Sequence, residues 1–471
     1  MKKIILIEKT ILFTRLAILL DDELIATYLE SCLNPDHQNK IIIGQVDKVV
    51  KNLNAAFIDY EGDKKALLHL SQVPTVYKDK MHQGTRIPIQ IIKQNEGQKG
   101  HKVTAKISIK GKYLVCLPFE QGVSVSKKIK SQLLRNTLKE TVSELSPHQY
   151  GFIVRTHAEN MPIEDIKEDA RQLINKVNHL MQVKDNLAKG SVLHEDFPMY
   201  VQIATENISG YEDVEVICDD LEMTKVLGEA LSDYTKKDAA IKVTYFDKKD
   251  DLFDIYAIHK EMNSLQNKKI WLKNGGNIIV DYTEALTVID VNSAKAIASN
   301  NHRKSVLELN QLAVKESILQ ILRRNLAGII IIDLIEMPYV EDKEQIYLYA
   351  KKIIMQTGDS RTTVFPLTEL GLLQISRSQK YTSIPRKIFA SCFCCDNPQG
   401  AFSNEYCAYL IEKRVKSIAY KTTNQEITVQ CSKEMLEFIS AYKINELLQD
   451  RYNIKINLIK MEKTTKNKFL C

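Results

Sequence analysis

The most constraining feature of this sequence is the apolar run IIIIDLIEM at residues 329–337, which contains an aspartate. A continuous run of this kind is typical of a strand that is covered on both faces. The segment NIIVDYTEALTVIDV before it predicts a pair of strands, and the intervening residues 302–326 have the pattern of a long helix. Residues 270–385 are therefore predicted to form an α/β unit.

Two aspartates end apolar strands in this unit, Asp290 in TVIDVNS and Asp333 in IIIIDLIEM. Binding sites of open α/β sheets gather at the carboxyl ends of strands, where such side chains can converge. Two carboxylates with a neutral oxygen, such as that of Asn292, suit Mg²⁺. The alternative is that the aspartates cap loops or pair with Arg323 or Arg324.

Five short segments rich in Ile and Val precede this unit and predict a small β-barrel, with the OB-fold as the natural candidate. They are IIIGQVDKVV, NAAFIDY, KALLHL, TRIPIQIIKQ and KVTAKISIKGKYLVCLP, within residues 40–118. Helices are predicted over 127–145 and 163–190, on either side of the strand GFIVRT. A strand is predicted for each of MYVQIA, DVEVIC and AIKVTYF, and strand, helix, strand for the last 70 residues.

Charge is unevenly distributed along the chain. The net charge is only +6, but residues 99–139 hold nine Lys and one Arg against one acid. Such a cluster favours a nucleic-acid partner. A composition of 44% hydrophobic and 26% charged residues excludes a wholly disordered chain, and most cysteines are scattered, as is usual in a reducing cytoplasm. No apolar run is long enough for a membrane helix, so no membrane partner is expected.

Long motifs in order along the chain resemble the ribonuclease E/G family. They are GQVDKVVKNLNAAFIDYEGDKKALLHLSQV, GFIVRT, EALTVIDVNS, LELNQLAVKESILQILRRNLAGIIIIDLIEM and TELGLLQISRSQ. The resemblance extends from the start of the chain to the cysteine-rich segment SCFCCDNPQG. The chain length suits a catalytic core without a disordered scaffold tail, as in the ribonuclease G type.

The resemblance implies an α/β multidomain fold with an S1-type OB-fold barrel inserted near the N-terminus. The expected parts are an RNase H-like subdomain (1–38 with 198–270), the S1 domain (39–118), a 5′-end sensor region (119–197), a DNase I-like catalytic domain (271–388), a zinc-link (389–400) and a small C-terminal α/β domain (401–471).

The resemblance also implies roles for individual residues. Asp290 and Asp333 would hold a catalytic Mg²⁺, with Asn292 assisting. Phe57, Lys99, Lys102 and Arg377 would contact RNA, and Arg155 with Thr156 would recognise a 5′-monophosphate. On the residues alone, Phe57 could equally be a core residue, and Arg155 and Arg377 could be solvated.

Cys392 and Cys395 form a CxxC pair, which supplies half of the four ligands that a structural Zn²⁺ requires. A symmetric partner chain would complete the site, and the family joins its subunits in this way. A homodimer or homotetramer is therefore expected. The alternative is a linker with incidental cysteines.

Several positions depart from the family pattern. They are Leu67 in place of an aromatic residue, Val123 and Ser124 in place of glycines, His157 and Ala158 after the Arg-Thr pair, Ala294 in place of glycine, Glu336 in place of aspartate, Phe393 in place of proline, and the extra Cys394.

These observations predict a cytoplasmic, Mg²⁺-dependent endoribonuclease. It would cut single-stranded, A/U-rich RNA to leave 5′-phosphate and 3′-hydroxyl ends, with precursor rRNA, tRNA and mRNA as substrate classes. One rival is a ribosome-associated RNA-binding protein with weak or lost catalysis. A second rival is a DNA nuclease, since DNA-cleaving folds also use paired acids.

Overall fold

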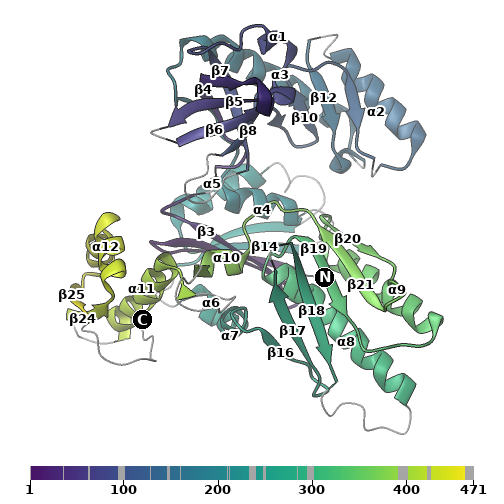
Figure 1. The fold of residues 1–471 in the computed structure, drawn as a ribbon, viewed down its shortest axis with the longest axis vertical. Helices are drawn as coiled ribbons and strands as arrows, with labels where there is room; N and C mark the ends of the chain where they lie inside the picture. The colour runs from purple at the N-terminus through teal and green to yellow at the C-terminus, as the bar shows by residue number, and fades with distance from the viewer. Residues whose placement is uncertain are drawn as a thin grey trace. The chain divides into compact units, whose positions relative to one another are not determined.

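The computed structural model describes the chain in ranges separated by gaps. These are residues 2–35, 37–61, 64–93, 101–127, 129–145, 149–159, 161–208, 211, 213–232, 240–247, 251–283, 285–293, 302–390, 401–421 and 426–461. The chain forms two compact units, one of Met1–Pro35 with Pro198–Cys471 and the other of Asp36–Phe197. The architecture is mixed α/β (Figure 1).

The second unit contains a closed five-stranded barrel. Its strands are β4 (Ile41–Val50), β5 (Ala55–Glu61), β6 (Lys64–His69), β7 (Arg86–Lys93) and β8 (Lys102–Thr104). The barrel closes because β4 pairs with both β5 and β7, while β8 bridges β6 and β7. This closed barrel is consistent with the predicted OB-fold. The strand β13 (Val192–His194) adds to β4 from outside the ring.

The segment expected to be one long fifth strand is instead three strands in two sheets. Only β8 belongs to the barrel, whereas β9 (Ile109–Lys110) and β10 (Leu114–Leu117) join a second sheet with β11 (Val123–Val125) and β12 (Gly151–Val154). The helices α2 (Gln132–Leu145) and α3 (Ile163–Val183) pack on this sheet around a shared core. Serine, lysine and glycine residues between the segments allow the chain to change sheets.

The first unit contains a five-stranded sheet whose strands are distant in sequence. Their order is β15 (Ala240–Tyr245), β14 (Asp213–Cys218), β1 (Lys2–Lys9), β2 (Phe13–Leu20) and β3 (Glu23–Ser31). Three of these strands, β1, β2 and β3, lie within the first 31 residues. The segment MYVQIA, predicted as a strand, is the start of helix α4 (Met199–Ile208), and the helix α5 (Leu221–Leu231) follows β14.

The predicted α/β unit is a six-stranded sheet in the order β16-β17-β18-β19-β21-β20. Its elements are β16 (Lys269–Trp271), β17 (Asn277–Tyr282), β18 (Leu286–Asn292), α8 (His302–Arg323), β19 (Gly328–Asp333), α9 (Val340–Thr357), β20 (Thr362–Phe365) and β21 (Leu372–Arg377). The strands β18 and β19 are parallel because α8 connects them as a crossover.

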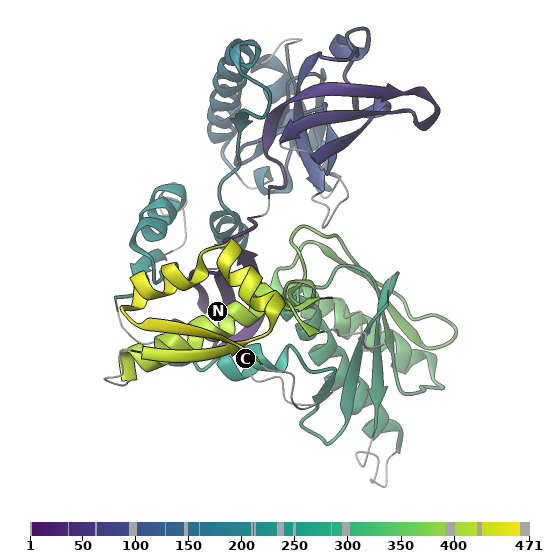
Figure 2. The ribbon, with the colours of Figure 1, turned by 60° about the vertical axis from the view of Figure 1, so that its left-hand side comes forward.

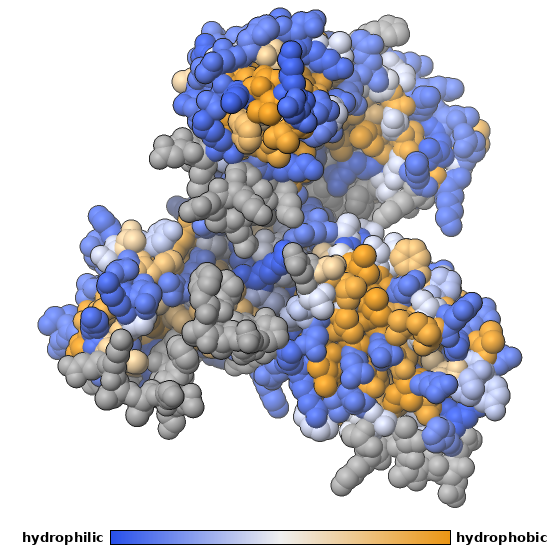
Figure 3. Space-filling model, viewed as in Figure 1, coloured by the Kyte–Doolittle hydropathy of each residue, from blue (hydrophilic) through white to orange (hydrophobic). Residues whose placement is uncertain are grey.

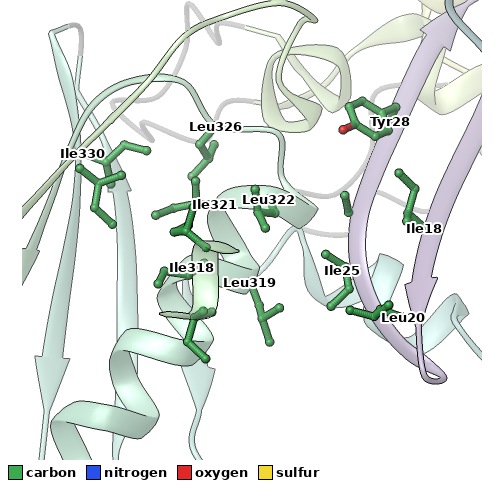
Figure 4. Packing of buried hydrophobic residues seen from close by; sticks show 14 of the residues in the cluster. Ile18, Leu20, Ile25, Tyr28, Ile318, Leu319, Ile321, Leu322, Leu326 and Ile330 are labelled. Carbon is green, nitrogen blue, oxygen red and sulfur yellow. The ribbon is translucent and has the colours of Figure 1, made fainter. Parts of the chain in front are cut away.

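Helix α8 is buried on most of its surface because it packs against two sheets of the first unit. Its residues Ile318, Leu319 and Leu322 belong to one core with Ile18 and Ile25 of the N-terminal sheet, as Figure 4 shows. The apolar residues in the second half of α8 are thereby removed from water on more than one side of the helix.

The strand β19 corrects the expectation that IIIIDLIEM is covered on both faces. Ile330 and Ile332 are fully buried on the helix-covered face, but Ile329 is 57% exposed on the other face. Within the described residues, one face of this sheet is therefore open. Figure 3 shows hydrophobic residues gathered over this region of the molecule.

The C-terminal part of the first unit adds a helix that the sequence pattern did not reveal. Its elements are α11 (Asn404–Lys421), β24 (Glu426–Cys431), α12 (Lys433–Ala441), α13 (Ile444–Tyr452) and β25 (Lys455–Lys460). The strands β24 and β25 pair in parallel beside these helices (Figure 2). The expected single helix is broken at Lys443, which has a left-handed backbone with φ of 51°.

Candidate active site

Asp290 and Asp333 are brought together by the register of two parallel strands. Asp290 on β18 lies directly opposite Asp333 on β19. Neighbouring strands are about 4.8 Å apart, so one small ligand can contact both carboxylates. Ile289 and Ile332 next to them are fully buried. Because side chains alternate along a strand, both aspartates project from the open face of the sheet.

Asn292 lies on the same face, two positions after Asp290. Its side-chain Nδ2 donates a hydrogen bond to Oδ2 of Asp290 at 2.7 Å. This bond fixes the orientation of one carboxylate and leaves the amide oxygen of Asn292 as a further oxygen ligand. The two strands therefore place all three predicted residues in one cluster.

The proposed alternative partners of the aspartates are engaged elsewhere. Arg324 donates to Gln320, Tyr282 and the carbonyl of Asn267, and Arg323 donates to the carbonyl of Leu24. Among the described residues, no cation forms an ion pair with Asp290 or Asp333. Two carboxylates this close repel each other, so a cation between them would stabilise the arrangement.

Two acids elsewhere in the first unit that have little exposed surface, Glu8 and Asp359, have arginine partners. Glu8 pairs with Arg15, and Asp359 pairs with Arg377 and Arg361. Burial opposes ionisation of Asp359, but the two guanidinium groups outweigh it and keep the pKa of its carboxyl below the ordinary value. The contrast identifies Asp290 and Asp333 as acids whose charge the described protein does not neutralise.

The donor set at this pair fits a hard divalent cation. Within the described ranges, no cluster of three or more His, Cys, Asp and Glu side chains is placed to hold a metal ion. The protein would thus supply two carboxylates and an amide oxygen, leaving positions for water and phosphate oxygens. Mg²⁺ commonly accepts such a shell.

The loop after Asp333 is held by residues that sequence reasoning missed. Asn310 on α8 is fully buried, accepts a hydrogen bond from the Ile335 backbone N–H at 3.0 Å and donates to the Ile335 carbonyl at 2.8 Å. Arg303 forms two 2.8 Å bonds to Asp342 and stacks over the Tyr339 ring. An asparagine among the apolar residues of a long helix was the only sequence signal for this role.

Glu336 lies in the described part of the chain, whereas Lys99 and the CxxC pair do not. Glu336, the acid that replaces an aspartate of the family, is exposed in the loop after β19. Lys99, Ala294 and the cysteines 392–395 lie outside the described residues. The roles expected of Lys99, Cys392 and Cys395 therefore stay predictions.

Arg377 is not placed where RNA could contact it. Its side chain is 1% exposed on β21, and it donates to Asp359, to Asn325 and to the carbonyl of Leu326. It faces the helix-covered side of the sheet, as Leu373 and Ile375 do. The burial of this arginine contradicts the expectation that it lies along an RNA path.

The barrel aligns the other predicted RNA contacts in one cross-strand row. Lys48 on β4 lies opposite Phe57 on β5, Phe57 lies opposite Leu67 on β6, and Leu67 lies opposite Lys102 on β8. Leu67 is 41% exposed and both lysines are exposed, so the row is on the outer surface of the barrel. We call these four residues the barrel row. Lys48 was not predicted, because its position depends on the pairing of β4 with β5.

Arg155 and Thr156 follow strand β12, as predicted. Arg155 is partly buried, and its Nη1 donates to the carbonyls of Gly111 and Lys112 at 2.9 and 3.2 Å. The Thr156 hydroxyl bonds to the Ser126 hydroxyl at 2.9 Å. Arg135 on α2 approaches the same place, since it donates to the Ser126 carbonyl at 2.6 Å. Two arginines therefore flank Thr156, and only one of them was predicted.

No helix within the described ranges combines the length and apolar character needed to cross a membrane.

Comparisons with known proteins identify the family of this chain. Residues 108–380 match the model of the ribonuclease E/G family. Ribonuclease G of Salmonella typhimurium and that of Escherichia coli K12 are each 26% identical over 426 residues, which cover 86% of this chain and 86% of each relative. Ribonuclease E of Synechocystis is 27% identical over 350 residues, 72% of this chain and 52% of that protein. Since the family match spans more than half of its length, the chain belongs to the ribonuclease E/G family, and this membership supports an RNA-binding endoribonuclease role.

Proposed function

We propose that this protein is a Mg²⁺-dependent endoribonuclease that cuts single-stranded, A/U-rich RNA and leaves 5′-phosphate and 3′-hydroxyl ends. The observation that carries the proposal is the pair Asp290 and Asp333, opposite each other on an open sheet face with no cationic partner among the described residues. Processing and decay of rRNA, tRNA and mRNA in the cytoplasm are the roles that the family implies.

In this proposal the chain itself positions the reacting groups. Asp290 and Asp333 hold the ion, Asn292 orients Asp290, and Asn310 keeps the loop after Asp333 in place. When bound, Mg²⁺ supplies charge stabilisation at the phosphate and lowers the pKa of the attacking water. The open face leaves room for a phosphodiester to approach in line.

Binding of the RNA chain is assigned to the barrel row. Phe57 offers one aromatic face for a base, and Lys48 and Lys102 flank it with positive charge. Stacking on an aromatic residue within a basic surface is the usual way to hold single strands. Leu67 supplies apolar contact without a second aromatic platform.

Recognition of a 5′-monophosphate is assigned to Arg155 and Thr156, supported by Ser126 and Arg135. Arginine and hydroxyl donors are well suited to a terminal phosphate. Cys392 and Cys395 are proposed to bind Zn²⁺ together with the same pair of a second subunit, which would give a homodimer or homotetramer.

Cleavage of a 5′-monophosphorylated single-stranded RNA in the presence of Mg²⁺ tests the proposal. Asp333→Asn should lower the cleavage rate about 100- to 1,000-fold, the usual loss when one group that stabilises transition-state charge is removed. Its affinity for RNA should be unchanged. Equal rates for the wild type and the variant would reject the nuclease assignment and favour an RNA-binding protein. Preferential cutting of single-stranded DNA would favour a DNA nuclease.

The two finer assignments have separate tests. Arg155→Ala should bring the cleavage rate of 5′-monophosphate RNA down to that of 5′-hydroxyl RNA, and equal rates in the wild type would already exclude sensing. The Cys392→Ser, Cys395→Ser variant should contain less zinc and form a smaller assembly, whereas unchanged zinc content and mass would exclude the shared site.

A further inference from the structure

Trp271 is the only tryptophan of the chain, and it lies on the open face of the sheet that holds Asp290 and Asp333. It ends the edge strand β16, and 65% of it is exposed. An indole this exposed is unusual, because tryptophan normally buries most of its large apolar surface. A bound partner that covers the ring would remove this apolar surface from water.

The strand register places Trp271 on the same face as the acid pair, two strands across and two residues along from Asp290. Trp271 lies opposite Asn277, and Asn277 lies opposite Asn292. Residues directly opposite on neighbouring strands share a face, so Trp271 is two strand spacings, or about 10 Å, from Asn292. We call Trp271, Asn277 and Asn292 the tryptophan row. The adjacent row runs from Lys269 through Ile279 to Asp290 and Asp333.

Positive charge accompanies the indole. The Lys269 Nζ lies 4.2 Å from the centre of the Trp271 ring. Lys273 is exposed in the turn that follows Trp271. An exposed aromatic ring with lysines around it has the chemistry that binds a nucleobase and its phosphates.

Asn277, in the middle of the tryptophan row, provides a second and independent observation. Its side chain is 3% exposed, and its Oδ1 has no hydrogen-bond partner in the described part of the chain. Leaving a buried polar oxygen unpaired is unfavourable, and an ordered water that bridges it to a bound nucleotide would offset that cost.

We propose that Trp271, with Lys269 and Lys273, is the stacking platform for a base of the RNA strand that is cut at the acid pair. This inference rests on the proposed function and adds to it a second base-binding site, separate from the barrel row. It assigns to the catalytic sheet its own contact with the substrate, two strands across and two residues along from Asp290.

The charge of the surroundings favours RNA over a protein partner at this position. The centres of protein interfaces are depleted in charged residues, whereas Lys269, Lys273, Asp290 and Asp333 surround the tryptophan row. The apolar part of the same face lies on the other side of the acids. It includes Ile329 and, on the opposite edge strand β20, Phe365, which is 43% exposed. The strand register places Phe365 two strands across and two residues along from Asp333, which is the same separation as that of Trp271 from Asp290. Phe365 is therefore a matched control within the same face.

Intrinsic fluorescence tests the platform directly, because all tryptophan emission comes from Trp271. We expect a short single-stranded RNA, added to the wild-type protein with Ca²⁺ in place of Mg²⁺ so that cleavage is slowed while a cation still neutralises the acid pair, to quench this emission in a saturable manner. Trp271→Ala should lower kcat/KM for RNA cleavage with Mg²⁺ by about 5- to 150-fold, the loss expected for one base stack. Trp271→Phe should retain most of the rate, and Phe365→Ala should match the wild type.

The outcomes separate this proposal from the proposed function. If the wild type cleaves RNA, but RNA leaves its emission unchanged and Trp271→Ala cleaves equally fast, the platform is wrong and the nuclease stands. If the wild type does not cleave but RNA quenches Trp271, the nuclease assignment is rejected and the RNA-stacking role of Trp271 is retained. If Trp271→Ala and Phe365→Ala both reduce the oligomeric mass and neither changes cleavage, the face is an interface between copies and the platform is overturned. Circular-dichroism melting of both tryptophan variants checks that they fold.

Discussion

The barrel row of one unit and the row of the other unit that contains the acid pair both cross neighbouring strands, and the two rows differ in charge. The barrel row consists of Lys48, Phe57, Leu67 and Lys102, without an acid. In the first unit, the row that contains Asp290 and Asp333 has a lysine only at its far edge.

The difference in charge indicates a division of labour, in which the barrel row binds RNA and the acid pair carries out the chemical step. A row of cations and an aromatic residue attracts phosphates and bases, so it suits binding. A pair of carboxylates repels phosphates until a cation is shared between them, so it suits metal-assisted chemistry. Binding affinity and chemical rate should therefore respond to different mutations, and the following experiments test that separation.

The largest effect is expected from the acid pair. Asp290→Asn and Asp333→Asn should each reduce the cleavage rate by about 100- to 1,000-fold. The double variant should be little worse than either single variant, because residues that act as one unit are not additive. Single-turnover cleavage rates give the comparison. A double variant whose rate reduction equals the product of the two single reductions would show that the acids act independently.

The barrel row should change affinity rather than rate. Phe57→Ala should weaken binding of single-stranded RNA by about 5- to 150-fold, because one base can no longer stack. Fluorescence anisotropy with labelled RNA in EDTA measures this effect, and single-turnover rates at saturating RNA should be unchanged. Leu67→Ala is the matched control and should have a smaller effect. A fall in the saturating rate of Phe57→Ala would contradict the division of labour.

The Asn310→Ala variant tests whether Mg²⁺ binding requires the loop after Asp333 to be fixed in position. Asn310→Ala removes both hydrogen bonds to Ile335. We expect it to raise the Mg²⁺ concentration for half-maximal cleavage by about 10- to 100-fold, the range typical when hydrogen bonds that support a metal site are removed. Ser317→Ala is the control, since Ser317 is also fully buried on α8. If both variants lose thermal stability equally and neither shifts the Mg²⁺ dependence, Asn310 is only structural.

The smallest effect concerns ionic strength. Replacing Lys48 and Lys102 together by alanine should reduce the slope of log affinity against log salt by about 0.7 for each phosphate that is no longer neutralised. Binding titrations at several salt concentrations measure the slope. Replacing Glu164 and Glu168, which are exposed on α3, by glutamine provides a control outside the row. An unchanged slope in the lysine variant would mean that the barrel row does not bind the RNA backbone.

Much of the fold could be predicted because the residues that recur with a helix or strand period in the sequence are the residues that are buried in the structure. The period of apolar residues identified α8, the strand pair β17–β18 and the barrel strands β4 to β7. The segment MYVQIA was misassigned because a short apolar run fits a strand and a buried helix equally well. IIIIDLIEM was expected to be buried on both faces, yet only its partner elements decide which faces are covered.

Prediction of the candidate site has the same limit, because the sequence pattern does not reveal which elements pack against each other. Asp290, Asn292 and Asp333 could be predicted because strand ends in an α/β unit meet at one edge of the sheet. Arg377 was misjudged because its motif does not indicate on which side of β21 it projects, and that side is filled by helices. Lys48, Asn310 and Trp271 gave no clear signal, since each acquires its role from a neighbour far away in the sequence.

The amino-acid sequence by itself therefore determined most of the element types, the strand-end aspartates and the family, because these depend on residue order and local periodicity. Only the tertiary structure decided that Asp290 lies opposite Asp333, that Arg377 is buried, and that Trp271 shares an open face with the acids. These are consequences of strand register and of which surfaces are covered, and long-range pairing sets both.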